Sequence, residues 1–179
     1  MTDSRLIFKL SSILLQYPDG EWISSRELRD EIFALGDEEI RKLFSDFMAY
    51  IDRTDLADLC SEYVNTFDFN EKTTLYLTYL QYGDQRERGQ ALVDLKARFE
   101  QAGYQITSEE LPDYLPLLLE FASVVPQSLA KEILESQCSI LEKLHSELEM
   151  MNSPYARVLQ ACLLSTGHSV QKDVAGGAS

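Results

Sequence analysis

Residues 73–95 read TTLYLTYLQYGDQRERGQALVDL, and helix and strand compete over the first ten of these residues. Threonine and tyrosine favour strands, so residues 73–82 taken alone could alternate their side chains between two faces. A lone strand needs a partner, however, and no second strand candidate stands out elsewhere in the sequence. We therefore predict a helix over residues 73–82 and, with it, an all-α fold.

The turn after this helix is marked by Gly83 and Asp84. Asp84 precedes Glu87 by three positions, which is the spacing of a capping box. The sequence therefore predicts that Asp84 caps the start of the next helix.

Apolar residues recur at helical spacing through most of the chain. At 179 residues the chain is long enough to bury one core, and no repeat or low-complexity segment divides it. We predict a single-domain bundle of roughly eight or nine helices over residues 1–166, followed by a flexible C-terminal tail over residues 167–179. In the irregular loop of residues 65–72, NTFDFNEK, we expect Phe67 and Phe69 to turn inward.

Two prolines lie four positions apart in the acidic segment SEELPDYLPLLLEF, residues 108–121. Pro112 fits the first turn of a helix, where its missing N–H costs nothing. Pro116 then falls one turn later, where it would remove a backbone hydrogen bond and clash with the preceding turn. The sequence predicts that the helix either starts late, near Pro116, or is distorted between the two prolines.

The charge of the chain is strongly acidic, with a formal net charge of -14. Such a surface repels phosphate backbones and anionic lipids, so nucleic acid and membrane surfaces are poor partners. No apolar run approaches the ~20 residues of a transmembrane helix, and the N-terminus does not resemble a signal peptide. Three widely spaced cysteines indicate neither a disulfide framework nor a zinc site. We expect a cytoplasmic protein.

Catalytic and cofactor motifs are absent from the sequence. His145 and His168 belong to no HExxH or Cys/His cluster, and the chain has neither a GxxxxGK[ST] nor a GxGxxG motif. We predict no enzyme activity, no metal site and no bound cofactor, and we expect both histidines to be solvated or satisfied. An enzyme with a site assembled from scattered residues stays open as an alternative.

Acidic residues are concentrated between Glu100 and Met150, a stretch that contains ten of them and only two lysines. Any single carboxylate there can be explained as part of a solvated helix face. Together they favour a basic ligand, because like charges gathered on one side repel each other.

The sequence therefore predicts a groove between helices that takes a basic amphipathic peptide. Tyrosine suits such a wall because it supplies a large amphipathic contact area, and carboxylates on the rim would steer the peptide. The predicted wall consists of Leu75, Tyr76, Tyr79, Leu80, Tyr114 and Leu117, with Pro112 in the kink beside it, and the predicted rim consists of Asp84, Glu109, Glu110, Asp113 and Glu120.

Five segments make the chain similar to a known family. They are YGDQRERGQALVDL (residues 82–95), FEQAGY (residues 99–104), ELPDYLPLLLEF (residues 110–121), SSILLQYPD (residues 11–19) and SPYARVL (residues 153–159). With these motifs the chain closely resembles the NarJ family, the assembly chaperones of respiratory nitrate reductase within the TorD/DmsD superfamily of redox-enzyme maturation proteins.

The resemblance implies a cytoplasmic, non-enzymatic, all-helical chaperone. Its partner would be the catalytic molybdenum subunit of nitrate reductase, bound mainly through its basic N-terminal segment and kept competent for insertion of the molybdenum cofactor and the iron–sulfur cluster. The alternatives are a helical adaptor or chaperone for another molybdoenzyme of the same class, or a direct molybdopterin or nucleotide binder. The wider superfamily carries an element of proline, aspartate and histidine in the peptide-binding region; Pro112 and Asp113 match it, whereas Tyr114 takes the place of the histidine.

Overall fold

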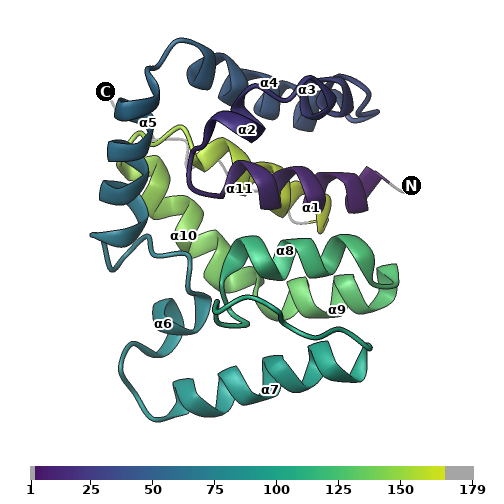
Figure 1. The fold of residues 1–179 in the computed structure, drawn as a ribbon. Helices are drawn as coiled ribbons and strands as arrows, with labels where there is room; N and C mark the ends of the chain where they lie inside the picture. Colours follow the sequence, from purple (N-terminus) through teal and green to yellow (C-terminus); the bar gives the residue numbers. More distant parts are fainter. Residues whose placement is uncertain (1–2, 168–179) are drawn as a thin grey trace, which may run out of the picture.

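The computed structural model describes residues 3–167, and every regular element in this range is a helix (Figure 1). The predicted all-α fold is confirmed. The described range holds eleven α-helices, more than the eight or nine predicted, because one-turn segments such as α2 are too short to show a periodic pattern. The elements are α1 (Asp3–Leu14), α2 (Gly20–Ile23), α3 (Arg26–Phe33), α4 (Glu38–Asp52), α5 (Leu56–Tyr63), the π-helical turn η1 (Val64–Asp68), α6 (Leu77–Tyr82), α7 (Glu87–Gln101), α8 (Leu115–Val124), α9 (Gln127–Ser136), α10 (Cys138–Met150) and α11 (Ala156–Ser165).

The first helix, α1, runs through the middle of the molecule (Figure 1). It packs along α8 on one side and against α11 on the other, while α4 and α10 cover α11. The buried apolar residues form one cluster that includes residues from every part of the described chain, with Leu10, Phe44 and Tyr155 among the largest fully buried side chains. The predicted tail, residues 167–179, lies outside the described residues except for Gly167.

Residues 73–82 are helical only in their second half. α6 begins at Leu77, and the residues before it are not helical: Thr73 lies in a turn, and the extended Tyr76 forms an isolated antiparallel bridge to Tyr114. The prediction of a helix over the whole segment was therefore wrong for residues 73–76. The missing strand partner is the proline-containing segment before α8, which has no strand-like composition of its own.

The two prolines have different roles in this partner segment. α8 begins at Leu115, so Pro116 lies in its first turn, where no N–H is needed. The late start of the helix is thus confirmed. Pro112 lies in the buried turn before it and starts no helix.

The predicted capping role of Asp84 was wrong. α7 begins at Glu87, its N-terminal flanking residue Arg86 is already in a helical conformation, and no side chain caps it. An additional turn over residues 83–86, closed by the hydrogen bond from the Gln85 N–H to the Tyr82 carbonyl, separates Asp84 from the helix. The side chain of Asp84 is exposed.

Candidate functional site

Two extended segments, one before α6 and one before α8, pair with each other at the centre of the candidate site. The N–H of Leu115 donates to the carbonyl of Leu75 at 2.9 Å, and the N–H of Leu77 donates to the carbonyl of Asp113 at 3.2 Å. This pairing brings the rings of Tyr76 and Tyr114 to 5.2 Å between centroids, tilted by 35°. The contact joins the two segments that the sequence marked as unusual.

The buried side chain of Asp113 adds hydrogen bonds between the same two segments. The residue is 0% exposed, and its Oδ2 accepts hydrogen bonds from the Thr78 N–H at 3.0 Å and from the Thr78 hydroxyl at 2.5 Å. The first turn of a helix has N–H groups without intrahelical partners, and a carboxylate there is favourable. Asp113 therefore caps α6 from a distant part of the chain. Its expected place on an exposed rim was wrong.

We expect Asp113→Ala to lower the free energy of unfolding by about 2–3 kcal/mol, because it removes two hydrogen bonds to a charged group and leaves the Thr78 N–H unpaired in the interior. Urea unfolding measures this loss. Asp113→Asn is the matched control: its amide oxygen can still accept from Thr78, so it should retain more than half of the stability lost in the alanine variant. Equal losses in both variants would contradict the capping role.

The pairing borders a cavity that we call the tyrosine pocket. It has a volume of about 310 Å³ and is bounded by α6, α7, η1 and the loop after η1. Its lining residues are Phe67, Asp68, Asn70, Glu71, Thr74, Tyr76, Tyr79 and Arg88. The cavity thus combines aromatic side chains with two carboxylates, Asp68 from η1 and Glu71 from the loop after it, neither of which was among the predicted site residues.

Carboxylates outnumber cations around the tyrosine pocket. The Tyr76 hydroxyl donates to Glu110 Oε2 at 2.7 Å, which brings a third carboxylate to the border of the cavity beside Asp68 and Glu71. The only cation among the lining residues is Arg88, whose guanidinium lies 5.3 Å from the centroid of the Tyr79 ring and donates through Nε to the Thr78 hydroxyl at 3.2 Å. The lining carboxylates Asp68 and Glu71 exceed this single cation by one charge.

The pKa values of three side chains that line the pocket are raised. Burial raises the pKa of the Asp68 carboxyl. The Glu71 carboxylate is the main cause of the raised pKa of Tyr79, and burial followed by the hydrogen bond to Glu110 raises that of Tyr76. The shift of Tyr79 reports the negative potential of Glu71, which favours a positively charged group near this ring, whereas burial alone disfavours charge of either sign.

The remaining predicted wall residues are divided between the core and a second cavity. Leu75 is buried, and Leu80 is half-buried against the core. Leu117 and Glu120 line a separate cavity of about 310 Å³ between the end of α7 and α8, together with Tyr104. The predicted single groove is therefore not found: Tyr76 and Tyr79 line one cavity, and Leu117 and Glu120 line another.

The predicted rim residues are likewise separated. Asp84, Glu109 and Glu120 are exposed, but Glu110 alone of the predicted rim residues bonds a tyrosine of the pocket. Sequence reasoning missed Asp68, Glu71 and Arg88. The irregular loop of residues 65–72 was the available signal, because a chain that leaves a helix through a π-helical turn often does so at a functional site.

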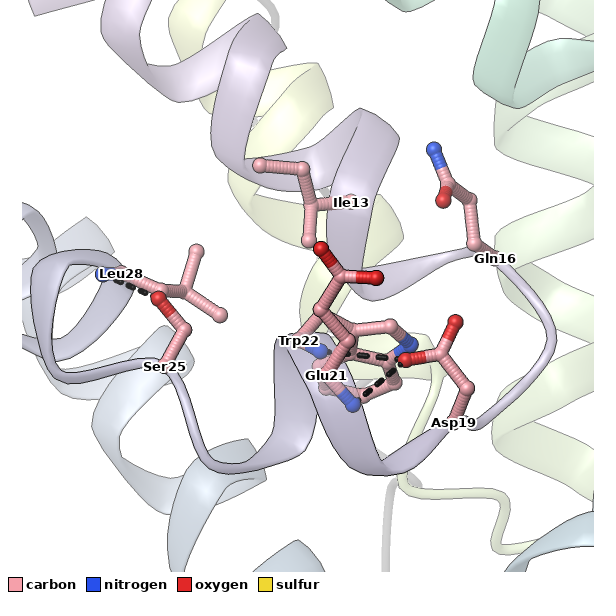
Figure 2. A pocket seen from close by; sticks show the side chains of 7 residues that line it. All are labelled: Ile13, Gln16, Asp19, Glu21, Trp22, Ser25 and Leu28. Atoms are coloured by element: carbon pink, nitrogen blue, oxygen red, sulfur yellow. Dashed lines mark hydrogen bonds between the residues drawn. The ribbon is translucent and has the colours of Figure 1, made fainter.

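The larger cavity between α1, α2 and α3 is a weaker candidate (Figure 2). It has a volume of about 370 Å³, and its polar side chains include Asp19 and Ser25. The Asp19 carboxylate accepts from the N–H groups of Glu21 and Trp22, and the Ser25 hydroxyl accepts from the Leu28 N–H. These groups cap α2 and α3. The oxygen atoms that accept these hydrogen bonds are therefore less available to bind a ligand.

Side chains that could bind a metal or act in catalysis are few in the described part of the chain. Within residues 3–167 no group of three or more His, Cys, Asp or Glu side chains could hold a metal ion. His145 is buried, and burial lowers its pKa, so the expectation of a solvated side chain was wrong; its Nε2 has no hydrogen-bond partner in the described range and lies 3.6 Å from Glu149 Oε1. His168 lies outside the described residues. Of the helices described, none combines the length and apolarity needed to cross a membrane.

Comparisons with known proteins agree with this fold and with the motifs. Residues 34–161 match the family model described as nitrate reductase delta subunit. The chain is 41% identical over 165 residues to the "Probable nitrate reductase molybdenum cofactor assembly chaperone NarJ" of Bacillus subtilis (strain 168), covering 90% of this chain and 89% of the relative. It is 37% identical over 166 residues to the nitrate reductase molybdenum cofactor assembly chaperone NarJ of Escherichia coli (strain K12), covering 90% and 70% of the two chains.

A solved structure shows the same fold. The crystal structure of a candidate redox enzyme maturation protein from Archaeoglobus fulgidus superposes with a TM-score of 0.69, covering 92% of this chain and 94% of the other at 20% identity. The family match spans most of the described chain, including both paired segments of the tyrosine pocket. The chain therefore belongs to the nitrate reductase delta subunit family, the NarJ family that its motifs resemble.

Proposed function

We propose that this protein is a system-specific assembly chaperone for nitrate reductase. In this proposal it binds the basic N-terminal segment of the catalytic molybdenum subunit and keeps that subunit competent for insertion of the molybdenum cofactor and the iron–sulfur cluster before membrane assembly. The relatives named as nitrate reductase molybdenum cofactor assembly chaperones support the client. The observation that carries the binding mode is the tyrosine pocket, where aromatic walls meet three carboxylates.

The chemistry of the pocket indicates how such a segment is held. An apolar side chain of the peptide packs against Tyr76, and a neighbouring lysine or arginine lies near Asp68 and Glu71, with Glu110 on the Tyr76 hydroxyl. Asp113 contributes by fixing α6, and Tyr114 by packing on Tyr76, rather than through a charge at the surface. Tyr114 stands in the place of the superfamily histidine, and its hydroxyl oxygen lies within hydrogen-bond distance, 3.3 Å, of the Tyr63 hydroxyl oxygen.

The protein acts in this proposal by binding and release, without a catalytic step of its own. It carries no cofactor and works in the cytoplasm, before the enzyme reaches the membrane. Leu117 and Glu120, in the cavity beside α8, stay candidate contacts for a longer part of the client.

Calorimetry with a synthetic peptide tests the proposal. The peptide would carry the first ~15 residues of the catalytic subunit from the same organism, about four helical turns. We expect a Kd of about 1 µM or tighter, and an affinity that falls as NaCl is raised, because part of the attraction comes from exposed charges.

Two controls separate the alternatives. A peptide with its lysines and arginines replaced by glutamine should lose most of the affinity while keeping its apolar residues. Equilibrium dialysis with molybdopterin or GTP should show little uptake by the chaperone alone. No heat with the native peptide at high concentration would remove the nitrate reductase assignment, and strong uptake of either small molecule would favour a direct cofactor or nucleotide binder.

A further inference from the structure

The π-helical turn η1 contributes side chains to two cavities. Phe67 and Asp68 line the tyrosine pocket, whereas Asn65 and Thr66 line a neighbouring cavity of about 370 Å³. The neighbouring cavity lies between α5 and the connection from α10 to α11, where Met151 completes its lining. Figure 1 shows the end of α10 beside α5. We call this second cavity the methionine pocket.

Two exposed apolar side chains belong to this part of the molecule: Phe69, next in sequence to the lining residues Asp68 and Asn70, and Met151. Phe69 was expected to turn inward, but its side chain is 79% exposed, and Met151 is 44% exposed. Asn70, a lining residue of the tyrosine pocket, contacts Met151 through Nδ2 and Sδ at 3.4 Å. Met151 lines the methionine pocket and contacts Asn70 of the tyrosine pocket, so the two cavities are adjacent. Exposed apolar patches with polar rims mark binding surfaces, and methionine adapts to varied partners.

The methionine pocket has the same charge preference as the tyrosine pocket. Its lining includes the carboxylates of Asp58 and Glu62 and contains no lysine or arginine. Glu62 is held in place by a hydrogen bond from the Tyr50 hydroxyl. The lining thus places Met151 in the same cavity as two carboxylates, with the exposed Phe69 ring nearby in sequence, which suits a partner that is both apolar and basic.

We infer that the methionine pocket is a second subsite for the same client polypeptide. In this inference, which rests on the proposed function, the client segment held in the tyrosine pocket continues across Phe69. The stretch that follows it places apolar side chains on Phe69 and Met151 and a basic side chain near Asp58 and Glu62. Two adjacent weak contacts on one chain act together, because binding of the first raises the local concentration of the second.

Two nested peptides from the catalytic subunit test the inference by calorimetry. The shorter carries the first ~12 residues and the longer the first ~25, so that only the longer can extend well beyond one pocket. On the parent chain we expect the longer peptide to bind about tenfold tighter. In the double variant Phe69→Ser, Met151→Ser the advantage of the longer peptide should disappear while the affinity for the shorter peptide is unchanged.

The matched control is Phe33→Ser, which removes an aromatic ring that is 82% exposed on α3. This variant should keep the full advantage of the longer peptide. Equal affinities of the two peptides on the parent chain would overturn the second subsite, as would an advantage that survives in the double variant. If neither peptide bound the parent chain, the proposed function and the subsite would both fall, so the two failures are distinguishable.

Discussion

The double variant Asp68→Lys, Glu71→Lys will bind the N-terminal peptide of the catalytic subunit about a hundred-fold more weakly than the parent chain. Both carboxylates line the tyrosine pocket, and burial already raises the pKa of Asp68. Reversal turns two attractions for the basic peptide into two repulsions, and a loss of ~1.4 kcal/mol at each position corresponds to a hundred-fold in Kd. Calorimetry at low and at high salt measures it, and the difference should shrink at high salt.

A control of equal charge distinguishes a local site from general attraction. Glu100→Lys, Glu142→Lys changes the net charge by the same amount on exposed positions of α7 and α10, outside the lining of the tyrosine pocket. We expect this variant to lose only about threefold in affinity, because screening weakens interactions beyond a Debye length. Equal losses in both variants would mean that the net charge of the chain, rather than the tyrosine pocket, attracts the peptide. Asp113 is unsuitable for charge reversal because it is buried.

Replacing Tyr155 with alanine will lower the free energy of unfolding by about 3–5 kcal/mol. Tyr155 is fully buried at the start of α11, and its ring lies 4.9 Å from the ring of Phe67 and 5.1 Å from that of Phe47. Truncation leaves a cavity among these aromatic rings. Since Phe67 also lines the tyrosine pocket, peptide affinity should fall together with stability. Urea unfolding followed by circular dichroism measures the first effect.

Tyr155→Phe is the control that separates the ring from the hydroxyl. The Tyr155 hydroxyl is buried and has no hydrogen-bond partner among residues 3–167. Because a buried polar group without a partner costs stability, its removal should change the free energy of unfolding by less than about 1 kcal/mol and can increase it. A loss in the phenylalanine variant as large as that in alanine would show that the hydroxyl, not the packed ring, stabilises this part of the core.

Sequence reasoning succeeded where side chains report their own surroundings. The helical spacing of apolar residues predicted the helical class, and the two prolines gave the late start of α8 as one of two expected outcomes. It failed where a segment depends on a distant one. The pairing of Tyr76 with Tyr114 joins residues 38 positions apart, and no local pattern announces it. The same pairing explains why Asp113, which looked like a rim carboxylate, is buried as the cap of α6.

By itself, the sequence determined the helical class, the acidic character and the membership in a family, because periodicity, composition and motifs are all properties of the linear chain. Only the tertiary structure decided which acids and aromatics meet. Asp68 and Glu71 join Tyr76 and Tyr79 in one cavity, while Leu117 and Glu120 line another. The physical reason is that side-chain direction near a site depends on how short extended segments and the π-helical turn pack against each other, and these contacts form only when the whole core is assembled.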